Sequence, residues 1–152
     1  MKHTGNLTIT DQNLETCLVL AEVTGELSVL AKGAQFPKLV KAGALYVRAK
    51  GAQFPELAEV TGALSVEAEG AQFPALVKTG WLSVEAKGAQ FPALGRVIAM
   101  STWGLVLLNN GMFCAGCRGP WTREQALAHW GERTDERAEL FTAAIRKLGE
   151  DA

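Results

Sequence analysis

The chain has 152 residues, of which 48% are hydrophobic and 20% are charged, enough apolar material for a continuous core. The formal net charge is −1, and residues 1–97 carry nine basic and nine acidic side chains, which excludes a strong field directing the protein to nucleic acid or to an anionic membrane. The first residues lack the pattern of a signal peptide, and no run of about 18 apolar residues occurs, so we expect a cytoplasmic protein.

Most of residues 1–97 is a repeat of 18 or 19 residues. Its clearest mark is the sequence GAQFP, which occurs four times and begins at Gly33, Gly51, Gly70 and Gly88. Each unit opens with an earlier glycine, and apolar residues follow two, four and six positions later, as Leu27, Val29 and Ala31 follow Gly25. This alternation is typical of a strand with one buried face, and the GAQFP glycine then ends the strand. Each unit is therefore predicted to form one coil of a stack.

Stacking places identical side chains of successive coils in columns. Coils about 4.8 Å apart would pair every strand with its neighbours, which a single coil of this length cannot do alone. The aromatic residue of GAQFP is expected to form one internal column, composed of Phe36, Phe54, Phe73 and Phe91. Because a fully buried large side chain contributes about 1.5–3 kcal/mol, this column is predicted to be a main source of stability.

A degenerate coil precedes the four regular ones. Gly5, Leu7 and Ile9 hold its strand positions, and Leu14 stands near the place of the phenylalanine. Cys17 falls in its connecting arc and is expected to be a small buried apolar residue rather than a reactive thiol. The sequence thus predicts about five coils within residues 1–97. Because only four residues precede this first coil, we expect it to be covered by its own irregular connection or to pair with a second molecule as a homodimer.

The units resemble leucine-rich repeats through their L-x-V-x-A strands followed by a turn and F-P-x-L. They are shorter than the 20–29 residues usual in that family, and no asparagine follows the strand to cap the turn. We therefore expect a mainly β protein whose coils form a right-handed parallel β-solenoid, rather than a wide horseshoe with outer helices.

Residues 98–152 are predicted to form a β-hairpin and a two-helix C-terminal cap. The apolar runs VIAM and LVLL are expected to be strands, with Asn109, Asn110 and Gly111 as the turn before MFCAG. A first helix is expected over residues 123–130, with Thr122 as N-cap and Gln125 completing a capping box. A second helix is expected over residues 135–148 after Thr134. Its apolar face comprises Ala138, Phe141, Ala144, Ile145 and Leu148.

Cys114 and Cys117 form the motif CAGC, a spacing that can bind zinc or exchange disulfides. A zinc site would need two further ligands, and His3 and His129 are the only imidazoles in the chain. His129 and its neighbour Trp130 are better explained as an aromatic pair that anchors a short helix. Structural cysteines are favoured, a small redox or zinc-binding module remains the alternative, and no cofactor is expected. No catalytic set can be assembled, so a non-enzymatic protein is predicted.

The outward positions of the predicted strands form a flat surface that we call the strand face. Its candidate partner-binding residues are large or charged side chains that have no internal role, namely Leu30, Tyr46, Arg48, Glu67, Trp81 and Glu85. Tyr, Trp and Arg are the residue types most often found at the energetic centre of protein interfaces. The strand face is therefore predicted to bind a protein partner.

The tail FCAGCRGPWTREQALAHWGERTDERAELFTAAI, after short GxLxVxA repeats, resembles uncharacterised proteins encoded by bacteriophages and mobile elements. That resemblance implies a protein that inhibits a bacterial defence system, such as an anti-CRISPR protein acting on a CRISPR-Cas complex. A duplex-like nucleic-acid mimic is less favoured, because the chain lacks a dense acidic surface.

Overall fold

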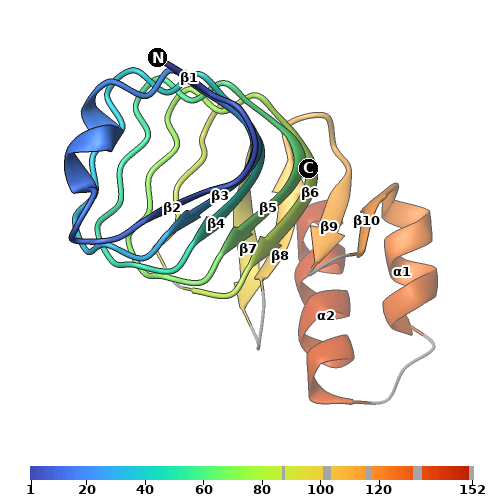
Figure 1. Ribbon diagram of the computed structural model, residues 1–152. Coiled ribbons are helices and arrows are strands. Elements are labelled where there is room, and N and C mark those ends of the chain that lie inside the picture. The colour runs from blue at the N-terminus through green and yellow to red at the C-terminus, as the bar shows by residue number, and fades with distance from the viewer. Residues whose placement is uncertain (87, 101–103, 116–117, 132–134, 151–152) are drawn as a thin grey trace.

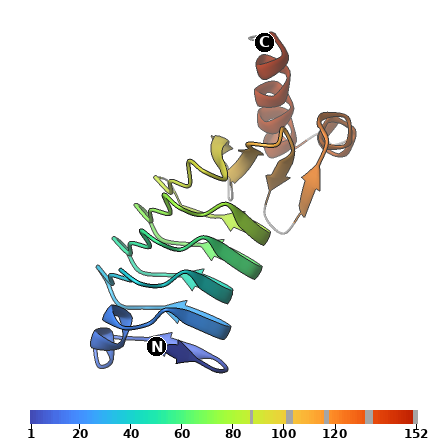
Figure 2. The same ribbon diagram turned by 90° about the horizontal axis from the view of Figure 1, so that it is seen from above.

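The computed structural model describes residues 1–86, 88–100, 104–115, 118–131 and 135–150. Its first part is a stack of parallel coils, which Figure 1 shows along the stack and Figure 2 from the side. The strands of this stack are β1 (Lys2–His3), β2 (Leu7–Ile9), β3 (Glu22–Val29), β4 (Lys41–Val47), β5 (Glu59–Val66) and β6 (Lys78–Val84). Both β1 and β2 pair with β3, and β4, β5 and β6 follow in order. The predicted β-solenoid of stacked parallel coils is confirmed.

Equivalent residues of successive coils lie beside one another. Leu27, Leu45, Leu64 and Leu82 are in register, and so are Val29, Val47, Val66 and Val84. The rings of Phe36 and Phe54 stack with centroids 4.7 Å apart, and those of Phe54 and Phe73 with centroids 5.0 Å apart. Phe91 is 1% exposed and belongs to the same core. Repetition of the sequence therefore produces repetition of the buried environment, as predicted.

The strands begin earlier than the sequence pattern indicated, before the glycine that opens each unit. Each pairing shifts its register around this glycine, for example between Val60 and Ala63. A Cβ atom built at Gly80 would lie 2.7 Å from the carbonyl oxygen of Gly62 and 2.8 Å from that of Thr61. The coils approach so closely at this corner that a side chain has no room.

The first coil departs from the prediction in its connecting arc. Leu14 does not take the place of the phenylalanine, because it lies at the start of the 3-10 helix η1 (Leu14–Leu18) and is 37% exposed. Cys17 and Leu20 fill the core there instead, and both are buried. Burial raises the pKa of the Cys17 thiol to about 11, so the expectation of a small buried residue is confirmed.

The side chain of Asn13 closes the open edge of β2. In a parallel ladder, the C=O before a residue and the N–H after it point toward the same neighbouring strand. The C=O of Ile9 accepts from the N–H of Leu30, the residue that follows β3, at 2.9 Å. On the other edge, Asn13 Nδ2 donates to Thr8 O at 2.8 Å, and Asn13 Oδ1 accepts from Thr10 N at 2.7 Å. A homodimer built on β2 would have to displace this amide, which already bonds the groups that an added strand would use.

Asn13→Ala is expected to leave Thr8 O and Thr10 N–H without these partners. Two lost hydrogen bonds should lower the free energy of unfolding by about 1–3 kcal/mol, and the opened edge should promote association. Thermal unfolding and sedimentation velocity at several concentrations, compared with the wild type, measure the two effects. Asn13→Asp keeps the acceptor but not the donor, so an intermediate result is expected. An Ala variant with unchanged stability and unchanged mass would contradict this role.

The C-terminal part begins with a four-stranded antiparallel sheet in the order β10-β9-β8-β7. Its strands are β7 (Gly95–Met100), β8 (Gly104–Leu108), β9 (Phe113–Ala115) and β10 (Arg118–Trp121). The expected turn joins β8 to β9, where Gly111 has φ +85° and its N–H donates to Leu108 O at 2.9 Å. The sequence predicted the hairpin but not β10.

The strands β8 and β9 contribute to two cores at once. Val106 and Cys114, which are in register, pack into the core of the solenoid. Leu105, Phe113 and Ala115 pack instead with the helices α1 (Arg123–Gly131) and α2 (Glu136–Glu150). Figure 2 shows the sheet between the last coils and these helices. The predicted cap is therefore attached through a sheet whose alternate side chains face opposite layers.

Both helices have side-chain caps at their N-termini. Gln125 N–H donates to Thr122 Oγ1 at 3.2 Å, and Thr122 N–H donates to Gln125 Oε1 at 2.9 Å, which confirms the predicted capping box. For α2, Asp135 Oδ1 accepts from Ala138 N–H at 2.8 Å. Thr134, expected just before this helix, lies outside the described residues.

Candidate functional site

One column of the strand face consists of Leu30, Arg48, Glu67 and Glu85, each placed immediately after a strand. Backbone hydrogen bonds fix their equivalent positions: Arg48 N–H donates to Val29 O at 3.0 Å, and Glu67 N–H donates to Val47 O at 2.9 Å. Glu85 N–H continues the series to Val66 O at 2.8 Å. The four side chains predicted from this column are therefore brought side by side.

Arg48 is held between an aromatic ring and a carboxylate. Its Cζ atom lies 5.7 Å from the centroid of the Tyr46 ring, and its Nε atom lies 2.9 Å from Glu67 Oε2. Both contacts favour the charged guanidinium, one through the ring quadrupole and the other through a charge-assisted hydrogen bond. The two contacts reduce the number of rotamers open to Arg48, so this side chain is largely oriented before any partner arrives.

Glu85 extends the same column and meets a like charge. Partial burial of its carboxyl group raises the pKa of Glu85, and the neighbouring charge of Glu67 and a hydrogen bond with it raise the pKa further. Arg48 forms its ion pair with Glu67. Glu85 is therefore the less compensated of the two carboxylates.

Glu85→Gln should change how stability depends on pH. Because folding raises the pKa of Glu85, its stabilising contribution is complete below the unfolded pKa and is lost as pH rises through the folded pKa. The wild type should therefore lose stability relative to Glu85→Gln between acidic and neutral pH. Melting temperatures of both proteins across this range test the expectation, and a constant difference between them would refute it. Glu56→Gln, at another exposed glutamate, is the control.

Trp81 and Leu30 supply the exposed apolar area of the strand face. Trp81 is 61% exposed and Leu30 is 49% exposed. Trp81 stands in a different column, in register with Ala63, and Thr79 Oγ1 donates to its carbonyl oxygen at 3.1 Å. Among the described residues, no ring, ion-pair or hydrogen-bond contact joins Trp81 to Tyr46 or Arg48. The structure thus gathers five of the predicted residues and places Trp81 in a separate column of the same face.

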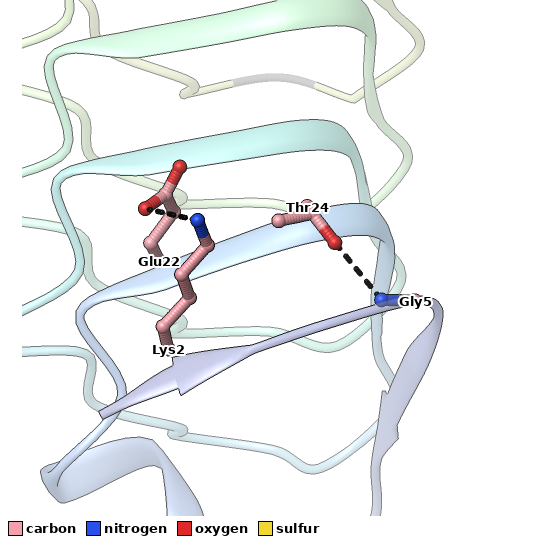
Figure 3. Close-up of polar contacts among 4 residues, drawn as sticks. All are labelled: Lys2, Gly5, Glu22 and Thr24. Atoms are coloured by element: carbon pink, nitrogen blue, oxygen red, sulfur yellow. Dashed lines mark hydrogen bonds and ion pairs between the residues drawn. The ribbon is translucent and has the colours of Figure 1, made fainter.

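A second charged column was missed from the sequence. It alternates in sign along the register, through Lys2, Glu22, Lys41, Glu59 and Lys78. Figure 3 shows its first step, where Lys2 Nζ lies 3.8 Å from Glu22 Oε2 and Gly5 N–H donates to Thr24 Oγ1 at 2.9 Å. At the other end, Lys78 Nζ lies 3.9 Å from Glu59 Oε1. Each of these ion pairs contributes little to stability. However, if a strand paired incorrectly with the strand two coils away, like charges would lie beside each other.

The structure describes only the first cysteine of the CAGC motif. Cys114 is 5% exposed in the solenoid core, and burial raises the pKa of its thiol to about 12. It therefore remains protonated at neutral pH, whereas metal binding and disulfide exchange both require a thiolate. Cys117 lies outside the described residues. Within the part of the chain that the structure describes, no three His, Cys, Asp or Glu side chains are grouped to hold a metal ion.

The aromatic residues of the tail anchor the cap, as predicted for His129 and Trp130. Trp130 is 2% exposed, and its ring meets that of Phe141 edge-on with centroids 4.9 Å apart. The His129 ring lies against Trp121, with centroids 4.7 Å apart. These contacts join β10, α1 and α2. His3, the other candidate ligand, has Nε2 3.0 Å from Asn6 O.

The strand face is the candidate site that the geometry supports best, because it combines an oriented arginine with exposed aromatic and aliphatic area. No helix in the described ranges is long and apolar enough to cross a membrane. Comparison of the chain with protein-family models, curated proteins and solved structures found no match, so the function has to be argued from the residues themselves.

Proposed function

We propose that the protein binds a protein partner through the strand face and has no catalytic activity of its own. The observation that carries this proposal is the fixed position of Arg48 between Tyr46 and Glu67, beside the exposed Leu30 side chain. Rigid aromatic, arginine and aliphatic groups lose little entropy on binding and bury a large area for their number. The parallel strands below them supply a flat and rigid support.

The partner we propose is a component of a bacterial defence complex. This class follows only from the resemblance inferred from the tail sequence; neither the geometry of the strand face nor the comparisons with known proteins test it. A compact protein that occupies a surface of such a complex can inhibit it by steric exclusion alone. This mode of action needs no cofactor and no nucleophile.

Tyr46→Ala/Trp81→Ala is expected to abolish capture of the partner from a bacterial lysate. Truncation of a central aromatic residue typically costs at least about 2 kcal/mol of binding free energy, or roughly thirtyfold in affinity. Immobilised wild type and variant are compared by mass spectrometry of the retained proteins. Both substitutions are on the surface of the sheet, so circular dichroism should show an unchanged fold.

The matched control is Gln53→Ala/Gln72→Ala. These two exposed glutamines lie on the turn side of the coils, where they pair with each other in a parallel bridge. The control should retain the same proteins as the wild type. If the aromatic variant also retained them, the strand face would not be the binding surface.

A further inference from the structure

Two hollows lie where the solenoid joins the helical cap. One, of about 390 Å³, is lined by residues 88–92 of the last GAQFP turn and by residues 95–97 at the start of β7. The other, of about 310 Å³, is lined by residues 96–98 of β7 and by Ala144, Lys147 and Leu148 of α2. Arg96 and Val97 line both hollows, which together we call the junction groove.

The floor of the junction groove is apolar and incompletely covered. Val97 packs against the solenoid core, whereas Ile98, Ala144 and Leu148 pack against the helical core. All four side chains are only partly buried. The groove therefore follows the seam between the two cores, where neither layer shields the apolar surface of the other.

The charged side chains of the junction groove are both positive. Arg96 comes from β7 and Lys147 from the last turn of α2, and both are exposed. Among the described residues, neither forms an ion pair, and no acidic side chain lines either hollow. Elsewhere, the cations of Lys2, Arg48, Lys50 and Lys78 are each within ion-pair distance of a carboxylate. The groove thus combines open apolar surface with two uncompensated positive charges.

We propose that the junction groove binds an acidic segment of a partner protein, which makes it a second interaction surface apart from the strand face. Carboxylates of the segment would pair with Arg96 and Lys147, and an apolar side chain between them would cover Ile98 and Leu148. Such complementarity favours an acidic sequence by attraction and rejects a basic one by repulsion. An uncharged apolar segment would leave both cations without compensation.

A charge-reversal experiment tests the proposal directly. The probe is a fluorescein-labelled peptide of alternating Glu and Leu, titrated with the full chain and followed by fluorescence anisotropy. The wild type should bind it, and Arg96→Glu/Lys147→Glu should weaken binding by at least about tenfold. The same variant should bind a peptide of alternating Lys and Leu more tightly than the wild type does. Binding of the acidic peptide that is absent, or unchanged by the reversal, would overturn the proposal.

Two controls separate this surface from general charge effects. Lys32→Glu/Lys38→Glu changes the net charge by the same amount at exposed positions outside the groove, and it should bind the acidic peptide like the wild type. Tyr46→Ala/Trp81→Ala should also bind normally, whereas a loss there would mean that the peptide occupies the strand face. A short DNA duplex that binds more tightly than the peptide, and is lost in Arg96→Glu/Lys147→Glu, would overturn the assignment to an acidic polypeptide.

Discussion

Phe54→Ala is expected to lower the free energy of unfolding by about 3–5 kcal/mol, the range found when a buried aromatic side chain is removed from a core. The Phe54 ring has no exposed surface and is stacked on both sides, at 4.7 Å from Phe36 and 5.0 Å from Phe73. Because both neighbours belong to rigid coils, the cavity cannot close without moving the stack. Urea denaturation of wild type and variant measures the loss.

Two further variants test whether the loss of buried aromatic volume causes this destabilisation. Phe54→Leu keeps most of the apolar volume and should cost less than Phe54→Ala. Tyr46→Ala removes an aromatic ring from the outward side of the same coil and should change stability by less than about 1 kcal/mol. If Phe54→Ala cost no more than Tyr46→Ala, the internal column would not be a main source of stability.

Gly80→Ala is expected to destabilise the protein by about 1–3 kcal/mol, the usual range for inserting a methyl group where no space exists. The new Cβ would lie 2.7 Å from Gly62 O and 2.8 Å from Thr61 O, so the two coils must separate. That separation would strain the hydrogen bonds between β5 and β6 on both sides of Gly80. Thermal unfolding gives the size of the effect.

Gly131→Ala is the matched control, because a Cβ at this position of α1 meets nothing within 4 Å. Alanine also has a higher helix propensity than glycine, by about 1 kcal/mol. The control should therefore be neutral or stabilising. A Gly80→Ala variant as stable as Gly131→Ala would show that the corner can accommodate a side chain.

The stacked coils could be predicted because each unit repeats its apolar spacing, and identical residues at a fixed interval imply identical environments. The first coil was predicted less well. Its pattern points to Leu14 as the substitute for the phenylalanine, but Cys17 and Leu20 take the core instead. The role of Asn13 was also hidden, because an amide that closes a strand edge is recognised only from the positions of the backbone groups it bonds.

The strand face was predicted from alternation alone, which gives the side of the sheet on which a residue lies. It does not give contacts between coils, so the pairing of Arg48 with Glu67 and the isolation of Trp81 required the structure. The column from Lys2 to Lys78 was missed because the units were aligned from their first glycine, which placed these residues in the preceding arc. The junction groove depends on how α2 packs against β7, and no local pattern reports that arrangement.

The alternating signs from Lys2 to Lys78 restrict how the molecule can change in length. Duplicating one coil would place two lysines or two glutamates in adjacent rungs, at a position where every existing neighbour is of opposite sign. Duplicating two consecutive coils would preserve the order throughout. Recombination that adds or deletes an even number of coils therefore keeps opposite charges in adjacent rungs, whereas an odd number brings like charges together.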